Sequence, residues 1–181
     1  MRPADPADIS CNWYFKGGRS PRERAAIDIL DYILSARYLA LIREERGGAY
    51  SVQFCTAVSN ENVLPSRSFV EFQTRPELRE LLLGDVRDEL ARMCADGPTR
   101  EEMELAVKYL VKHHAEQEDR IARSVSLQED RMTSYVRWGT PYGYEYARLV
   151  RSLRPADVRK QARRIAGGDR LVKVYNEEAA K

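Results

Sequence analysis

The sequence predicts an α+β fold: one mixed, mostly antiparallel sheet with helices packed on one face. The chain has 181 residues, 43% of them hydrophobic and 32% charged, which is typical of one globular domain with a full core. The expected elements run strand, helix, strand, strand, several helices, strand, without regular βαβ alternation. Two of the expected helices begin with capping boxes, which fix where they start.

The first strand and the first helix are separated by a Gly-Gly pair. Residues 9–16, ISCNWYFK, form a short aromatic-rich run that predicts a strand. Ser20 is the expected N-cap of the helix, because Glu23 stands three positions later and a Pro takes the first helical position. The helix is expected to run to about Glu45, where a second Gly-Gly pair ends it. Its apolar residues recur at helical spacing and predict a buried stripe: Ala26, Ile27, Leu30, Ile33, Leu34 and Leu41.

A hairpin and a second helix follow. Residues 49–59 and 66–74 both have strand patterns, and the turn-forming stretch NENVLP lies between them. They predict an antiparallel hairpin. The next helix is expected from Pro76 to about Ala95. Six apolar residues are expected on its buried face: Leu78, Leu81, Leu82, Val86, Leu90 and Met93.

The second capping box, Thr99 with Glu102, starts a helix that is expected to continue to about Met132. The stretch RWGTPYGYEY, residues 137–146, is dense in aromatics, Gly and Pro. A packed loop explains it better than an aromatic binding surface, which stays an alternative. The remaining expected elements are a helix near 143–152, a helix over 154–166 and a closing strand over 169–176.

The charge balance argues against a nucleic-acid or membrane protein. The 30 basic and 28 acidic residues leave a net charge of +2. The basic stretch RSLRPADVRKQARR, 151–164, is therefore better explained as a solvated helix face than as a nucleic-acid interface. No apolar run approaches the roughly 20 residues of a membrane helix, and the N-terminus lacks a signal-peptide pattern. Cys11, Cys55 and Cys94 form no CxxC and are expected to be buried free thiols.

Metal chemistry has little support within the chain. The stretch HHAEQ places His113 and Glu116 as in the inverted zinc motif H-x-x-E-H, but Gln117 takes the last ligand position. Catalytic zinc usually needs three protein ligands and one open position. A solvated helix face is therefore the better explanation of this stretch, and no metal ligand is predicted in this chain.

Arg43 and Tyr50 are the candidate functional pair. By composition alone they are an ordinary surface Arg and an ordinary strand Tyr. Their placement suggests more, because the chain reverses at Gly47-Gly48 between a helix end and a strand entrance. Both side chains are then expected at one edge of the domain. A guanidinium beside a phenol supplies donors for a carbonyl oxygen or a developing oxyanion.

The stretch LIREERGGAYSV, residues 41–52, resembles the signature of the C-terminal, non-zinc half of pitrilysin-type zinc metallopeptidases, the inverzincins. That signature has an Arg and a Tyr seven positions apart, as Arg43 and Tyr50 are. Two later segments also resemble this half-domain: DGPTREEMELAVKYL, 96–110, and RPADVRKQARRIAGGDRLVKVY, 154–175. The resemblance covers roughly residues 10–176.

This resemblance implies a division of labour between two halves of a zinc endopeptidase that degrades peptides in a closed chamber. Zinc would be bound by a different domain, through H-x-x-E-H, and this chain would carry no cofactor. Arg43 and Tyr50 would hold the substrate backbone near the scissile bond and stabilise the tetrahedral intermediate, with Gly47 and Gly48 positioning them. The first helix has no His, so the chain alone is expected to be inactive.

The same resemblance sets the expected context of the chain. The partners are an N-terminal zinc-binding half or partner subunit and a peptide substrate, with no nucleic acid and no membrane insertion. The parent protein is expected in the bacterial periplasm or cell envelope. Residues 1–8 are expected to be a linker or leader, 9–176 the single peptidase C-terminal domain and 177–181 a tail. Two alternatives stay open: a non-catalytic structural or partner subunit of the same family, and a basic nucleic-acid-binding α+β module.

Overall fold

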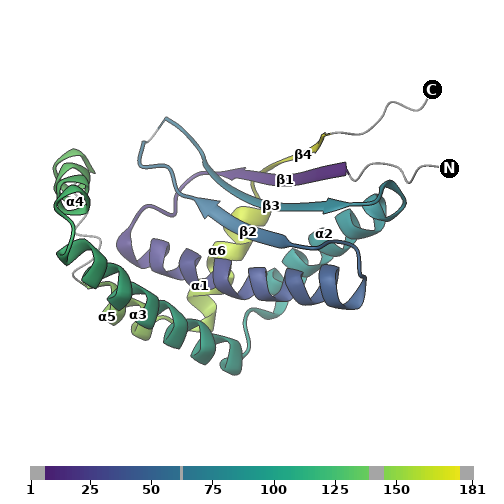
Figure 1. Ribbon diagram of the computed structural model, residues 1–181. Coiled ribbons are helices and arrows are strands. Elements are labelled where there is room, and N and C mark those ends of the chain that lie inside the picture. The colour runs from purple at the N-terminus through teal and green to yellow at the C-terminus, as the bar shows by residue number, and fades with distance from the viewer. Residues whose placement is uncertain (1–6, 62, 139–144, 176–181) are drawn as a thin grey trace.

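The computed structural model describes residues 7–61, 63–138 and 145–175, and it has the predicted α+β architecture. The helices α1, α2, α3, α5 and α6 lie on one side of the sheet, while α4 stands apart beside it (Figure 1). The elements follow in this order: β1 (Ala7–Phe15), α1 (Pro21–Tyr38), the π-helical η1 (Leu39–Glu45), β2 (Val52–Ala57), β3 (Ser66–Thr74), the 3-10 helix η2 (Pro76–Leu78), α2 (Arg79–Asp96), α3 (Arg100–Ala122), α4 (Val125–Trp138), α5 (Tyr146–Ser152), α6 (Pro155–Ala166) and β4 (Asp169–Tyr175).

The sheet has the strand order β2-β3-β1-β4, and all of these pairings are antiparallel. β2 and β3 form the predicted hairpin, and β3 occupies the predicted range. Burial alternates along β3, from Ser66 to Thr74, because successive side chains point to opposite faces of a sheet. The first strand therefore ends up between the hairpin and the last strand of the chain.

The main core lies between the sheet and α1. The predicted stripe of α1 is buried, except for Leu41 in η1, which is half-buried. α1 packs on β2 and also contacts α3, α5 and α6, so it is the central helix of the domain. Tyr38 at its end is fully buried, and its hydroxyl donates a hydrogen bond to the Val86 carbonyl at 3.0 Å. This contact fixes the end of α1 against α2.

Both predicted capping boxes are confirmed. The Ser20 hydroxyl accepts from the Glu23 amide while the Glu23 carboxylate accepts from the Ser20 amide. Thr99 and Glu102 do the same at the start of α3. Each box satisfies amide groups that lack an intrahelical partner, so each helix begins at the predicted residue.

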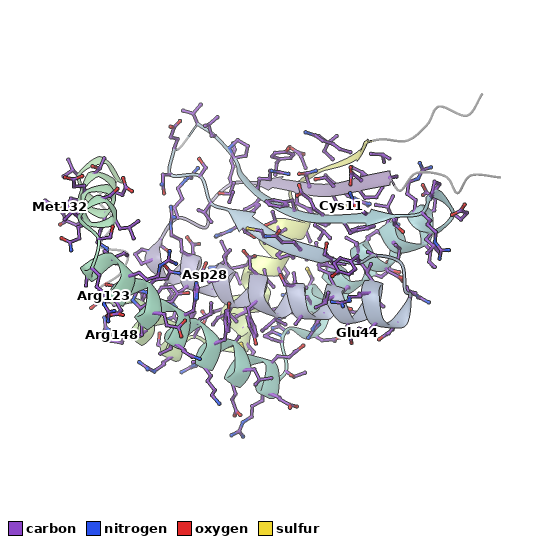
Figure 2. All side chains as sticks on the ribbon, viewed as in Figure 1. Cys11, Asp28, Glu44, Arg123, Met132 and Arg148 are labelled. Carbon is purple, nitrogen blue, oxygen red and sulfur yellow. The ribbon has the colours of Figure 1, made fainter. Side chains whose placement is uncertain are left out.

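The single helix predicted from Thr99 to Met132 is wrong in its last third, because α3 ends at Ala122 and a separate helix begins at Val125. Ser124 starts a new helix by accepting the Leu127 amide with its hydroxyl, and the Gln128 side chain donates to the carbonyls of Ile121 and Ala122. Those side-chain bonds satisfy backbone groups at both helix ends. As a result α4 leaves the domain body, and Met132 on it is 68% exposed (Figure 2).

Smaller differences concern element boundaries and faces. The strand predicted over 49–59 is shorter, since its pairing with β3 begins at Val52. Leu81 is exposed and not buried, because the inward face of α2 carries Leu82, Val86 and Leu90.

The C-terminal elements match the prediction more closely. The helix predicted over 154–166 and the strand predicted over 169–176 are present as α6 and β4. The helix expected near 143–152 begins at Tyr146, and residues 139–144 of the predicted aromatic loop lie outside the described residues. None of the helices described is long and apolar enough to cross a membrane.

Candidate functional site

Arg43 and Tyr50 come together at the end of the long helix. The Cζ atom of Arg43 lies 5.6 Å from the centroid of the Tyr50 ring. Both side chains are exposed, Tyr50 to 86%. The guanidinium N–H groups and the phenol are therefore accessible to a molecule that approaches this edge, and both are hydrogen-bond donors.

The helix that carries Arg43 ends in a π-helical segment. The Arg46 amide bonds to the Leu41 carbonyl, five residues back, at 3.1 Å. Such widened turns are rare in proteins overall, and those that occur are often at functional sites. Ile42 is fully buried, whereas residues 43–47 are exposed. The segment thus anchors one side chain in the core and presents the next ones to solvent.

Gly47 and Gly48 make the reversal, each for a different reason. Gly47 has φ = 57°, a left-handed conformation that L side chains rarely adopt, and no other atom would lie within 4 Å of an added Cβ. Gly48 packs closely on α2, because a Cβ there would lie 2.8 Å from Cδ1 of the buried Leu82, which would have to shift. Its carbonyl also accepts the Thr74 hydroxyl at 2.7 Å. The turn is therefore fixed to both α2 and the end of β3.

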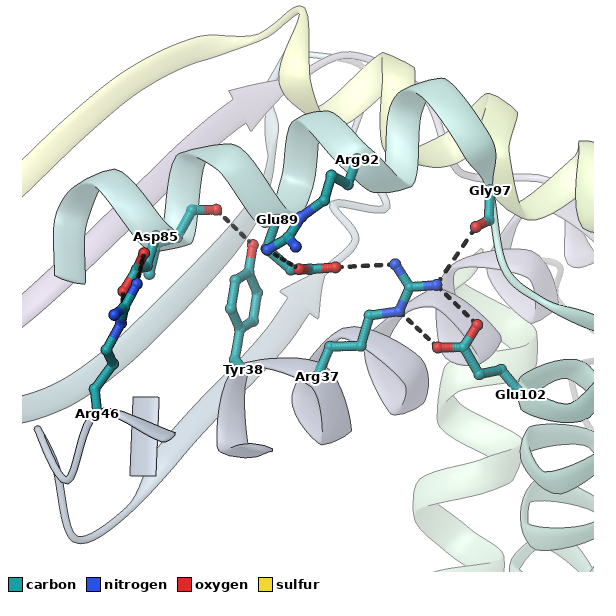
Figure 3. Close-up of polar contacts among 9 residues, drawn as sticks. Arg37, Tyr38, Arg46, Asp85, Glu89, Arg92, Gly97 and Glu102 are labelled. Atoms are coloured by element: carbon teal, nitrogen blue, oxygen red, sulfur yellow. Dashed lines mark hydrogen bonds and ion pairs between the residues drawn. The ribbon is translucent and has the colours of Figure 1, made fainter. Parts of the chain in front are cut away.

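Arg46, within the exposed segment, is tied to α2. Its Nε and Nη2 atoms donate to the two carboxylate oxygens of Asp85 at 2.9 and 3.2 Å (Figure 3). This bidentate geometry fixes the orientation of the guanidinium as well as its distance. Hydrogen bonding to Asp85 also raises the pKa of Arg46.

A more buried ionic cluster lies more than two turns earlier, on α1. Arg37 donates to Glu89 at 2.9 Å and to both oxygens of Glu102 at 2.6 and 2.8 Å, and Arg92 also pairs with Glu89 (Figure 3). The side chain of Glu89 is only 8% exposed. The bonds to Glu102 hold the pKa of Arg37 above its usual range, and the bonds from Arg37 lower the pKa of Glu102. The cluster links α1, α2 and α3.

Asp31 makes a polar contact that was not predicted from the sequence. It faces β2, where it accepts the Thr56 amide at 2.8 Å and bonds the Thr56 hydroxyl at 2.7 Å. Burial raises the pKa of Asp31 to about 8. No local sequence pattern signals this contact, because an Asp at this helix position is equally compatible with an exposed face.

Residues suited to metal binding do not converge in the described part of the chain. No group of three or more His, Cys, Asp or Glu side chains there lies close enough to hold a metal ion. In HHAEQ, His113 is exposed beside Gln117, while the His114 ring contacts the Tyr146 ring in a tilted arrangement with centroids 4.7 Å apart. This donor set does not fit a catalytic zinc ion, which requires three convergent ligands.

The basic stretch over 151–164 is used largely for internal contacts. On α6, Arg159 donates to the Ala95 carbonyl and Arg163 to the Cys94 carbonyl, at the end of α2. Arg164 pairs with Glu23 at 2.6 Å. These arginines tie α6 to its neighbours.

The thiols of Cys11, Cys55 and Cys94 are free, but only Cys11 is fully buried.

Comparisons with known proteins agree with this fold. The sequence profile described as "Peptidase M16 inactive domain" matches residues 2–110. A search of curated proteins gives no match. The structure resembles the peptidase M16 inactive domain from Pseudomonas fluorescens, with a TM-score of 0.77 and 18% identity over 95% of this chain and 41% of that one.

Two further solved structures are similar. One is the periplasmic protease PqqL from Escherichia coli, with a TM-score of 0.76 and 19% identity over 96% of this chain and 19% of that one. The other is the inactive peptidase domain of a putative zinc protease from Bordetella parapertussis, with a TM-score of 0.74 and 16% identity over 100% and 97%. The chain thus spans less than half of the Pseudomonas and Escherichia chains, and nearly all of the Bordetella domain. The match over 2–110 and the shared half-domain fold confirm the resemblance noted in the sequence: the chain belongs to the peptidase M16 family, as an inactive, C-terminal, non-zinc domain.

Proposed function

We propose that this chain is the substrate-contacting half of a zinc-dependent endopeptidase that degrades peptides. The observation that carries this proposal is the exposed pair of Arg43 and Tyr50 at one end of the domain, where Cζ of Arg43 lies 5.6 Å from the centroid of the Tyr50 ring. Membership in the M16 family supports the reaction class.

The proposed role of the pair follows from its donors. Arg43 and Tyr50 donate hydrogen bonds to the carbonyl oxygen of the scissile region and hold the peptide backbone in place. As the carbonyl becomes tetrahedral its oxygen gains negative charge, so the same donors bind the transition state more strongly than the ground state. Gly47 and Gly48 position the pair by making the reversal between them.

The rest of the reaction belongs to other parts of the proposed enzyme. Zinc, bound by an N-terminal half or a partner subunit, supplies an activated water when present. The two halves enclose the peptide in a chamber. The proposed single C-terminal domain runs to residue 176, with 177–181 as a tail. It begins before the predicted residue 9, because Ala7 and Asp8, assigned above to the linker or leader, already pair with β3. The similar Escherichia coli protein is a periplasmic protease, which supports a periplasmic or cell-envelope location for the parent.

The test is peptide turnover by the full-length parent enzyme with Arg43→Ala or Tyr50→Phe. Each substitution is expected to lower kcat by about 10²-fold, since loss of one oxyanion donor typically costs that much. Tyr135→Phe, at an exposed Tyr on α4, and Arg87→Ala, at an exposed Arg on α2, are matched controls that keep full turnover. Unchanged turnover in both Arg43 and Tyr50 variants would overturn the proposal and favour a structural partner subunit.

A further inference from the structure

One face of α2 makes consecutive contacts with the segment that leads to the Arg43–Tyr50 pair. Its residues 82, 85, 86 and 89 are spaced at helical intervals and so share one side of the helix. From the start of α2 onward, they meet Gly48, Arg46, Tyr38 and Arg37 in that order. The two chain directions are opposite, so α2 lies along the whole end of the α1–η1 helix (Figure 3).

These contacts differ in what they hold. Glu89 and the Val86 carbonyl bind Arg37 and Tyr38, which lie in the buried part of α1. Leu82 packs on Gly48, within the reversal. Between these fixed points residues 43–47 are exposed, and Asp85 reaches into that interval by binding Arg46. The pair of Asp85 and Arg46 is therefore a side-chain contact from α2 within this exposed interval, three residues after Arg43.

The geometry of this contact restrains position more than it adds stability. The Arg46 side chain is 41% exposed, and ion pairs in such surroundings contribute little to folding. Both Asp85 oxygens are nevertheless engaged, and Asp85 itself is only 15% exposed, so the guanidinium has one favoured orientation. Arg46 is also the residue whose amide closes the π-turn and which directly precedes Gly47. Fixing its side chain fixes the backbone that carries Arg43 and leads to Tyr50.

We propose that Asp85 is a positioning residue for the Arg43–Tyr50 pair and that it acts through Arg46. Its catalytic consequence rests on the function proposed above, whereas its effect on the geometry of the pair does not. Asp85 touches no substrate. It keeps the segment between Ile42 and Gly48 in the one arrangement that places the Arg43 guanidinium beside the Tyr50 ring. Small displacements of such groups are costly, since a shift of about 1 Å can reduce turnover by about 10²-fold.

The geometric part is tested on this chain by NMR. Side-chain protons of Arg43 next to the Tyr50 ring have ring-current shifts, which Tyr50→Leu abolishes and thereby identifies. Asp85→Asn and Arg46→Ala are expected to reduce these shifts at least twofold, while Asp85→Glu, which keeps the charge, retains most of them. Asp88→Asn, on the same helix but paired with the exposed Arg87, is the control that leaves them unchanged. Unaltered shifts in Asp85→Asn and Arg46→Ala would overturn the proposal.

The catalytic part is tested by kinetics of the full-length parent. Asp85→Asn and Arg46→Ala are each expected to lower kcat about tenfold with KM within twofold, and the double variant to lose no more than either single one. A variant that lowers Tm but keeps kcat at a temperature where the protein is folded would show a merely structural role and overturn the proposal. If Tyr50→Phe also keeps full turnover, the proposed function fails, and the NMR result still decides whether Asp85 positions the pair.

Discussion

Replacing Gly47 with Ala should destabilise the chain, although the added methyl group meets no other atom. The position has φ = 57°, and nothing lies within 4 Å of an added Cβ, so the effect is confined to the backbone. Placing an L residue in the left-handed region costs about 1–2 kcal/mol. The lower entropy of the unfolded chain returns about 0.4–1 kcal/mol of this. The expected net loss is about 1 kcal/mol in the free energy of unfolding.

Gly84 offers a matched control of opposite sign. It lies within α2, a Cβ there would also have nothing within 4 Å, and its φ is not in the left-handed region. Gly84→Ala should therefore stabilise the chain by about 0.5–1 kcal/mol, because Gly inside a helix is less favourable than Ala by that amount. The two substitutions add the same methyl group, so their difference reports only the backbone conformation.

The assay is urea unfolding followed by circular dichroism, with the thermal midpoint as a second measure. A change of about 1 kcal/mol corresponds to roughly 2–4 °C in Tm for a chain of this size. Gly47→Asn should fall between Gly and Ala, since Asn tolerates the left-handed region better than Ala. If Gly47→Ala is as stable as the parent chain or more stable, the left-handed turn at this position is wrong.

The remaining predictions concern the buried polar groups. Arg37→Ala should lower the free energy of unfolding by about 3 kcal/mol, because it leaves the nearly buried carboxylate of Glu89 with fewer partners. Arg100→Ala, at a highly exposed ion pair, should lower the free energy of unfolding far less. Equal losses for the two variants in urea unfolding would contradict this prediction. Asp31 should make stability pH-dependent, because its pKa of about 8 in the folded chain lies above the ordinary value of 3.8. Between these two pH values the folded chain keeps a proton that the unfolded chain has lost. The free energy of unfolding should therefore fall as the pH rises from about 4 to about 8. Asp31→Asn should flatten this slope in urea unfolding measured from pH 4 to 8, and parallel slopes for the two proteins would refute the assignment.

Elements with local causes could be predicted from the sequence. The Ser20 and Thr99 capping boxes depend on residues three positions away, and both helices begin where these boxes place them. The break at Ser124 had a local signal too, since its hydroxyl caps Leu127 three residues later. The helical spacing of apolar residues continued past this position and hid it.

Contacts between distant segments could not be predicted in the same way. Arg37 meets Glu89 and Glu102, which are 52 and 65 residues further along the chain. The residues near Arg37 in the sequence do not distinguish it from an exposed arginine on the same helix. The contact of Asp31 with Thr56 was missed for the same reason.

Local sequence patterns were sufficient to predict the α+β class, the starts of α1 and α3, the hairpin and the presence of Arg43 and Tyr50 on either side of a Gly-Gly reversal. Those features depend on backbone preferences and spacing over a few residues. Three features depend on the packing of distant segments: the π-turn that ends the helix, the ion pair of Arg46 with Asp85, and the position of the Arg43 guanidinium beside the Tyr50 ring. These contacts require α2 to lie along the end of α1, and that packing is set by burial of apolar surface across the whole domain, which no short stretch of sequence specifies.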